Sequence, residues 1–180
     1  MMAAAMLTLL SCKDKKPEDK GIIKTDYVAP KPTGPKATAV NSVTESIEWI
    51  DGRRYMVNIN GHGEETLPMV QDENGQQYID NAIRVEVTRA DSTLFYGHTF
   101  TKDSFSEWLN TDYRKNAILT DINFLEPEGN ILKFVVSLNY PEASDDEALD
   151  LLLQLDSQGN TSIKPFTYNE RDDLEVIDQE

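Results

Sequence analysis

The chain has 180 residues, a formal net charge of −15 and a single cysteine. This acidity argues against a nucleic-acid partner, because binding through counterion release requires a basic surface. A single cysteine also excludes a disulfide bond within the chain.

The N-terminus is typical of a bacterial secretion signal. Residues 1–11 carry no charge and consist mostly of Ala, Leu and Met, but a membrane-spanning helix needs about 20 apolar residues. Leu9-Leu10-Ser11-Cys12 resembles the lipobox of lipoproteins, which implies cleavage before Cys12 and acylation of that residue. No Lys or Arg precedes the apolar run, so either the true start lies elsewhere or the signal is weak. The alternative is a cytosolic protein with a free cysteine.

Composition divides the remaining chain into a tether, a domain and a tail. Residues 12–36 contain four prolines and seven lysines against four acidic residues, which predicts an extended, basic tether suited to an anionic membrane surface. The rest of the chain holds ten basic and 28 acidic residues. We expect one β-rich domain over residues 37–170 and an acidic tail over residues 171–180.

Alternation of apolar and polar residues predicts several strands in chain order. The first hairpin joins residues 47–49 to residues 55–59 through Asp51-Gly52, a favoured two-residue turn. A second pair of strands flanks the turn at Asp91-Ser92. Further strands are predicted at residues 122–124, 132–138, 149–155 and 163–166. A helix start at Ser144-x-x-Glu147 competes with the strand at 149–155, but four leucines at every second position favour the strand.

One short helix is predicted at about residues 101–110. Ser104-x-x-Glu107 has the spacing of a capping box, and Phe105, Trp108 and Leu109 have the spacing of a single helix face. Residues 113–119 either extend this helix or form a second turn. The predicted fold is therefore α+β and mainly antiparallel β. It is a compact twisted sheet, or a sandwich or partial barrel, of about seven to nine strands with the helix packed on it.

The sequence contains no recognised catalytic or metal-binding motif. His62 and His98 are expected in a loop and a strand, and the acidic stretches at 72–75 and 145–147 read as solvated turns rather than calcium sites. We expect no catalytic residue, no metal and no cofactor. A carboxylate pair for glycoside hydrolysis stays open, because so many acidic residues are present.

Several short motifs resemble a family of Bacteroidetes envelope lipoproteins of unknown function. The motifs are Thr99-Phe100-Thr101-Lys102-Asp103-Ser104-Phe105, Ala117-Ile118-Leu119, Ser137-Leu138-Asn139-Tyr140-Pro141 and Tyr78-Ile79-Asp80-Asn81. The resemblance covers roughly residues 45–165 together with the lipobox. It implies an envelope lipoprotein with a compact β-rich domain, but it supplies no site. Asp91-Ser92-Thr93 also resembles a short Bacteroidetes sequon, which makes Ser92 a candidate for O-glycosylation.

These observations predict a lipid-anchored, non-enzymatic binding module of the bacterial cell envelope, on either face of the outer membrane. Its expected partners are the bilayer, through acylated Cys12, and an envelope protein, glycan or lipid. The candidate ligand contacts are aromatic, although most of them also fit the core: Trp49, Tyr55, Tyr78, Tyr96 and Trp108. The alternatives are an envelope hydrolase with a carboxylate site and a purely structural lipoprotein.

Overall fold

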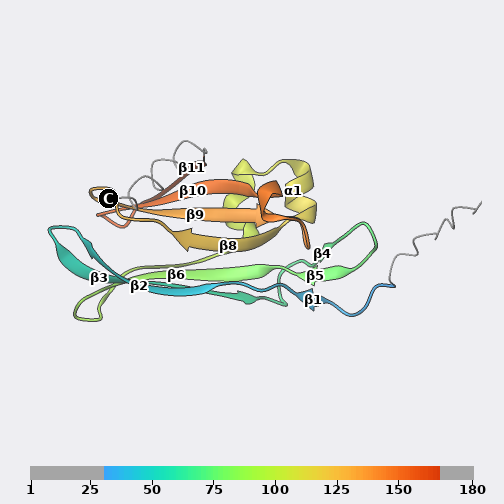
Figure 1. The fold of residues 1–180 in the computed structure, drawn as a ribbon, viewed down its shortest axis with the longest axis horizontal. Coiled ribbons are helices and arrows are strands. Elements are labelled where there is room, and N and C mark those ends of the chain that lie inside the picture. The colour runs from blue at the N-terminus through green and yellow to red at the C-terminus, as the bar shows by residue number, and fades with distance from the viewer. Residues whose placement is uncertain (1–30, 167–180) are drawn as a thin grey trace, which may run out of the picture.

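The structure is a computed structural model that describes residues 31–166 (Figure 1). The predictions for the signal peptide at 1–11, for Cys12, for the tether up to residue 30 and for the tail at 171–180 lie outside the described residues. Within residues 31–166, no helix combines the length and the apolar character needed to cross a bilayer.

Two four-stranded antiparallel sheets form the two main layers (Figure 1). The first has the strand order β2-β3-β6-β7, and its strands are β2 (Ser42–Trp49), β3 (Arg53–Gly63), β6 (Asn81–Arg89) and β7 (Leu94–Phe100). The second has the order β11-β10-β9-β8, with β8 (Ile118–Phe124), β9 (Ile131–Asn139), β10 (Leu149–Asp156) and β11 (Thr161–Pro165). Every neighbouring pair in these two sheets is antiparallel.

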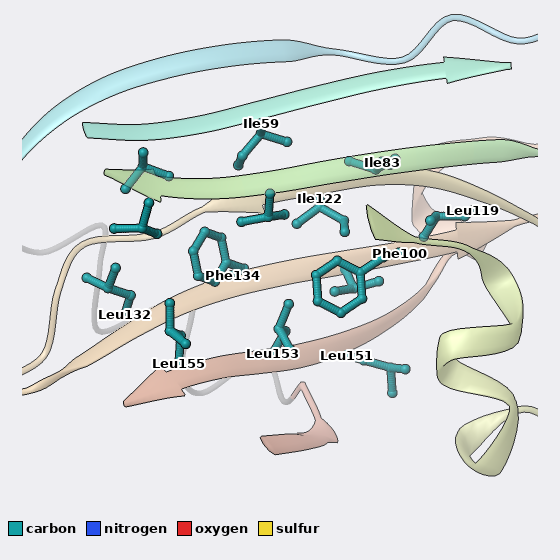
Figure 2. Packing of buried hydrophobic residues seen from close by; sticks show 14 of the residues in the cluster. Ile59, Ile83, Phe100, Leu119, Ile122, Leu132, Phe134, Leu151, Leu153 and Leu155 are labelled. Atoms are coloured by element: carbon teal, nitrogen blue, oxygen red, sulfur yellow. The ribbon is translucent and has the colours of Figure 1, made fainter. Parts of the chain in front are cut away.

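One hydrophobic core fills the space between the two sheets (Figure 2). Alternate residues of each strand point to the same face, so a strand with apolar residues at every second position buries one full side. The fully buried members from the two layers include Val57, Ile83, Val85, Val87, Ile122, Leu132, Val136 and Leu138. The period-two pattern that predicted the strands is therefore the pattern that builds the core.

A small third sheet lies at one end of the molecule (Figure 1). It pairs β5 (Gln77–Ile79) with β1 (Lys36–Ala37) in parallel and with β4 (Val70–Gln71) antiparallel. Only Asp80 separates β5 from β6. Because β6 belongs to the first main sheet, Asp80 lies where the small sheet meets the sandwiched core.

Two short helices join β7 to β8 at the same end of the molecule. The first, η1 (Lys102–Trp108), is a 3-10 helix in which the backbone N–H of Thr101 donates to Ser104 Oγ at 3.1 Å. The second, α1 (Thr111–Asn116), is capped by Asn110, whose side chain accepts from the N–H of Tyr113 at 2.9 Å. Another 3-10 turn, η2 (Asp145–Glu147), precedes β10.

The expectation of a mainly antiparallel β fold is confirmed, and the sheets do not close into a barrel. The choice of a strand at residues 149–155 is also confirmed. The two main sheets hold eight strands, within the predicted seven to nine, and the small sheet adds three that were not predicted, which gives eleven among the described residues. Three of them have only two or three residues, too few to show alternation in sequence.

The helix prediction is correct in position but wrong in detail. Ser104 is the third helical residue rather than the cap, because the helix begins one turn earlier than the predicted capping box. Phe105 and Leu109 are buried as expected, whereas Trp108 is 40% exposed. Residues 111–116 form the second helix, and Ile118 and Leu119 already belong to β8.

Candidate functional site

A buried ion pair lies at the junction of the small sheet, the first main sheet and the helices. Asp80 Oδ2 is 3.2 Å from Lys102 Nζ, and the two side chains are only 4% and 12% exposed. The other carboxylate oxygen of Asp80 accepts from the backbone N–H of Asn81 at 2.8 Å and of Leu119 at 3.0 Å. Each of these contacts helps to offset the cost of removing the charge from water.

The network around this pair joins four separate parts of the chain. Lys102 Nζ donates to the carbonyl oxygen of Ala117 at 2.6 Å, which ties η1 to the residue before β8. Asn81 Nδ2 donates to the carbonyl oxygen of Leu119 at 2.8 Å and to Thr38 Oγ1 at 3.0 Å. Asn81 Oδ1 is buried and has no hydrogen-bond partner among the described residues. The network therefore fixes β6, η1, β8 and the residue after β1 relative to one another.

Three of the motifs that carry the family resemblance meet in this network. Asp80 and Asn81 come from the motif at residues 78–81, Lys102 from the motif at 99–105, and Ala117 and Leu119 from the motif at 117–119. Sequence reasoning did not single out any of these residues as a site, because a lone acid and a lone lysine in distant segments carry no signal of contact. The one signal in the sequence that could have found these residues was their position inside the motifs that carry the family resemblance.

The ion pair lies in the wall of a cleft. The cleft runs between residues 67–73, which include β4, and the two helices η1 and α1. Its inner part has a volume of about 310 Å³ and is lined by Leu67, Pro68, Met69, Val70, Asp80, Thr101, Lys102, Asp103, Arg114 and Lys115. Its outer part, of about 690 Å³, shares Met69 and Lys115 and adds Gln71, Asp72, Glu73, Asp112, Asn116, Tyr140 and Pro141. We call the two parts together the helix cleft.

The helix cleft combines an apolar wall with charges of both signs. Met69 is 41% exposed and is one of three large apolar residues that are so exposed in the described chain. Arg114 and Lys115 lie on the facing helix wall. An exposed methionine between charged groups suits the docking of a segment with both apolar and charged side chains.

Two carboxylates of the outer part of the cleft, those of Asp72 and Asp112, are held by hydrogen bonds within the chain. Asp72 Oδ1 accepts from the N–H groups of Asn74 and Gln76, both at 2.9 Å, so this carboxylate closes the turn predicted at residues 72–75. Asp72 Oδ2 accepts from the hydroxyl of Tyr78 at 3.4 Å. Asp112 accepts from Asn116 Nδ2 at 2.6 Å and from the hydroxyl of Tyr140.

The contact between Asp112 and Tyr140 changes the ionisation of both groups. The hydrogen bond to Asp112 raises the pKa of Tyr140 from 10.0 to about 12, because a phenolate would face the carboxylate. The same hydrogen bond lowers the pKa of Asp112. Because the pKa of Tyr140 is higher in the folded than in the unfolded chain, its protonated hydroxyl contributes to the stability of the fold. This contribution is complete below about pH 10 and is lost as the pH rises through about 12.

We therefore expect Tyr140 to ionise late, near pH 12, and Tyr140→Phe to remove that step from the alkaline titration. Asp112→Asn keeps a hydrogen-bond acceptor but removes the charge, so it should move the step back towards pH 10. The absorbance of tyrosinate during an alkaline titration checks both variants. An unchanged late step in Asp112→Asn would contradict the assignment.

The candidate aromatic residues are dispersed over the molecule. Trp49 and Tyr55 pack edge to face, with ring centroids 5.3 Å apart, and both also contact Phe95. Both are almost fully buried, as is Tyr78, which is 1% exposed. Tyr96 is half-buried on β7, where burial raises its pKa. Within residues 31–166, no ring contact joins Tyr78, Tyr96 or Trp108 to the Trp49 cluster.

The remaining candidates lie on the surface. Ser92 is exposed in the turn between β6 and β7, with a φ of 66°. The prediction of a loop at His62 is wrong, because this residue lies in β3 and pairs with Ala82 of β6. Its side chain is 3.6 Å from Glu64, and His98 packs against Phe100 on β7, as a strand residue. Within the described chain, no group of three or more His, Cys, Asp or Glu side chains is arranged to hold a metal ion.

The family model described as "Domain of unknown function (DUF4738)" matches residues 22–163. The match spans more than two thirds of the chain and includes every strand of the structure except the last two residues of β11. No curated protein matches the sequence.

Proposed function

We propose a function for this chain, which belongs to the DUF4738 family of domains of unknown function, from the helix cleft and the N-terminal sequence. The protein is a lipid-anchored, non-enzymatic binding module of the bacterial cell envelope. Its helix cleft holds a peptide segment of another envelope protein. Acyl chains on Cys12 keep the module at the membrane.

The observation that carries the binding role is the cleft above the buried pair of Asp80 and Lys102. Its base is fixed by the hydrogen bonds of this pair, so little of the site has to become ordered when a ligand binds. Its rim offers the exposed side chain of Met69 next to Lys115. A fixed base and an adaptable apolar rim suit a peptide better than a small molecule, which is usually enclosed on most sides.

The hydrolase alternative receives less support from the same cleft. Glycoside hydrolysis requires two carboxyl groups that face one substrate bond. Asp72 and Asp112 instead hold a turn and a tyrosine of the protein itself. Because these two carboxylates already accept hydrogen bonds from the chain, the cleft favours a binding role over hydrolysis.

Two features support the anchor. One is the lipobox-like sequence that ends at Cys12, and the other is the length of chain between Cys12 and the first strand of the domain. The first strand begins at Lys36, and the 23 residues between Cys12 and Lys36, if extended at about 3.1 Å each, would span roughly 70 Å. That length would place the domain well clear of the bilayer surface.

Photo-crosslinking in cells tests the binding role. A photoreactive amino acid is placed at Lys115 in the cleft, or at Thr44, which is exposed on the far side of the first sheet. We expect one adduct of defined mass from position 115 only, and Met69→Glu should weaken it. The same adduct from both positions, or none from position 115, would overturn the binding role.

The anchor is tested separately with Cys12→Ser. The wild-type chain should incorporate labelled palmitate and sediment with membranes, and the variant should do neither. Equal behaviour of the two chains would refute the anchor without affecting the crosslinking result.

A further inference from the structure

Two aliphatic side chains lie on the outer face of the second sheet. Leu151, Leu153 and Leu155 of β10 point towards the first sheet (Figure 2). Leu152 alternates with them along the strand, so it faces the opposite, outer side. It pairs with Val135 of β9, which faces outwards for the same reason. We call Leu152 and Val135 the outer pair.

The outer pair is as well buried as the core. Leu152 is 1% exposed and Val135 is 5% exposed, although neither belongs to the cluster of buried residues between the sheets. The first sheet has the usual outer face of a two-layer fold, whose outward residues meet water. Its outward residues Met56, Asn58 and Glu86 are all only partly buried. The outer pair therefore has a cover that the first sheet lacks.

The strands and helices of residues 31–166 do not supply this cover. The helices η1 and α1 lie at one end of the molecule, and no third layer of described residues is stacked along the middle of β9 and β10 (Figure 1). The neighbours of the outer pair in the same row are Asn123 on β8 and Lys164 on β11. These polar side chains flank the outer pair, but a lysine keeps its charge in water and does not form an apolar layer.

A second molecule is not the cover either, because the structure holds one chain and the outer pair is buried within it. The cover therefore belongs to residues outside the range 31–166. Residues 1–30 precede β1, which lies in the small sheet at one end of the molecule. Residues 167–180 follow β11, which is the direct neighbour of β10 in the second sheet. The C-terminal segment is therefore the nearer of the two candidates.

The chain leaves β11 next to the outer pair. The N–H of Phe166 donates to the carbonyl oxygen of Asp150 at 3.2 Å, two residues before Leu152 along β10. The segment 167–180 follows at once. At roughly 3.3 Å per residue its extended length would be about 45 Å, whereas β9 lies only about 10 Å from β11. The segment is long enough to cross the outer pair.

The composition of the segment suits a cover that faces water on its other side. It contains Leu174, Val176 and Ile177, together with six acidic residues and one arginine. The aliphatic side chains can meet the outer pair while the charged ones stay in solvent. Removing one large aliphatic side chain from water changes an equilibrium constant by about tenfold or more, so three of them can hold a short segment in place.

We infer that residues 167–180 dock on the outer face of the second sheet and cover the outer pair with Leu174, Val176 and Ile177. The segment is thus an intramolecular cap, and its displacement would uncover an apolar strip on β9 and β10. The family match ends at residue 163, so the cap lies outside the matched domain. The cap depends neither on the helix cleft nor on the anchor.

Photo-crosslinking of the purified full-length chain, in nonionic detergent, tests the cap. A photoreactive amino acid replaces Gln154, which faces outwards two residues beyond Leu152. The control position is Met56, on the outer face of the first sheet. Isotopically light and heavy chains are mixed before irradiation. We expect a crosslink from position 154 to a peptide of residues 167–180, with both peptides light or both heavy, and none to that segment from position 56.

Two double variants show whether the apolar side chains hold the cap. Val176→Asp/Ile177→Asp should lower the yield of this crosslink by about tenfold or more, because charged groups replace two aliphatic contacts. Asn169→Asp/Gln179→Asp is the matched control, since it adds the same two charges at polar positions. It should change the yield by less than about twofold. Far-ultraviolet circular dichroism should be the same for both variants, so the loss reports docking rather than unfolding.

Three results would overturn the cap. The first is a crosslink from position 154 that joins a light to a heavy peptide, which would place a second copy on the outer pair. The second is a crosslink from position 154 to residues 1–166 only. The third is an equal yield from the two double variants, which would show that the apolar side chains of the segment hold nothing.

Discussion

Asp80→Ala is expected to lower the free energy of unfolding by about 3–5 kcal/mol, because it leaves the ammonium of Lys102 buried without its counter-charge. The backbone N–H groups of Asn81 and Leu119 lose their acceptor at the same time. Urea unfolding of the full-length chain, followed by tryptophan fluorescence, measures the loss.

Two further variants separate the buried pair from a general effect of lost charge. Asp103→Ala removes an exposed carboxylate from the same cleft and should cost less than about 0.5 kcal/mol. Asp80→Ala/Lys102→Met removes both charges and should cost less than the sum of the single changes. If Asp80→Ala were no more harmful than Asp103→Ala, the ion pair would not hold the cleft together.

Phe105→Ala should also cost about 3–5 kcal/mol, because it empties a fully buried position between η1 and the main core. The ring of Phe105 stacks on Phe100 with centroids 5.7 Å apart, and it is the one buried side chain within η1. Since η1 also carries Lys102, a loosened helix should weaken the crosslink at the cleft as well as the fold.

Trp108→Ala provides the comparison for Phe105→Ala. Trp108 belongs to the same helix and is larger, but it is 40% exposed. We expect its removal to cost roughly 1 kcal/mol, because less of its surface leaves water on folding. Similar losses from both variants in urea unfolding would show that η1 is not held to the core through Phe105.

The strands of the two main sheets were predictable because each of them has one face on the core. Residues 149–155 illustrate this, since Leu151, Leu153 and Leu155 all point inwards and the intervening residues do not join that cluster. Such a pattern depends only on neighbours in sequence. The turns at Asp51-Gly52 and Asp91-Ser92 were placed correctly from their residue types. The first was predicted with two residues, but residues 50–52 form a three-residue connection between the paired Trp49 and Arg53.

The small sheet and the helix cleft were not predictable in this way. β1, β4 and β5 have two or three residues each, and they exist because distant segments pair with one another. The contact of Asp80 with Lys102 likewise joins separate segments, and neither residue type is usually buried. Aromatic content directed attention to Trp49 and Tyr55, but these residues are buried in contact with each other.

The parallel pairing of β1 with β5 has a mechanical consequence. A pull on the chain from its N-terminal side reaches the fold first at two residue pairs of β1 and at three hydrogen bonds between the side chain of Gln76 and residues 33 and 34. These few bonds are far weaker than the strand pairs of the main sheets, so tension would peel β1 away while the core stayed intact. β5 continues directly into Asp80, and the helix cleft would therefore be the first part of the domain to respond to load.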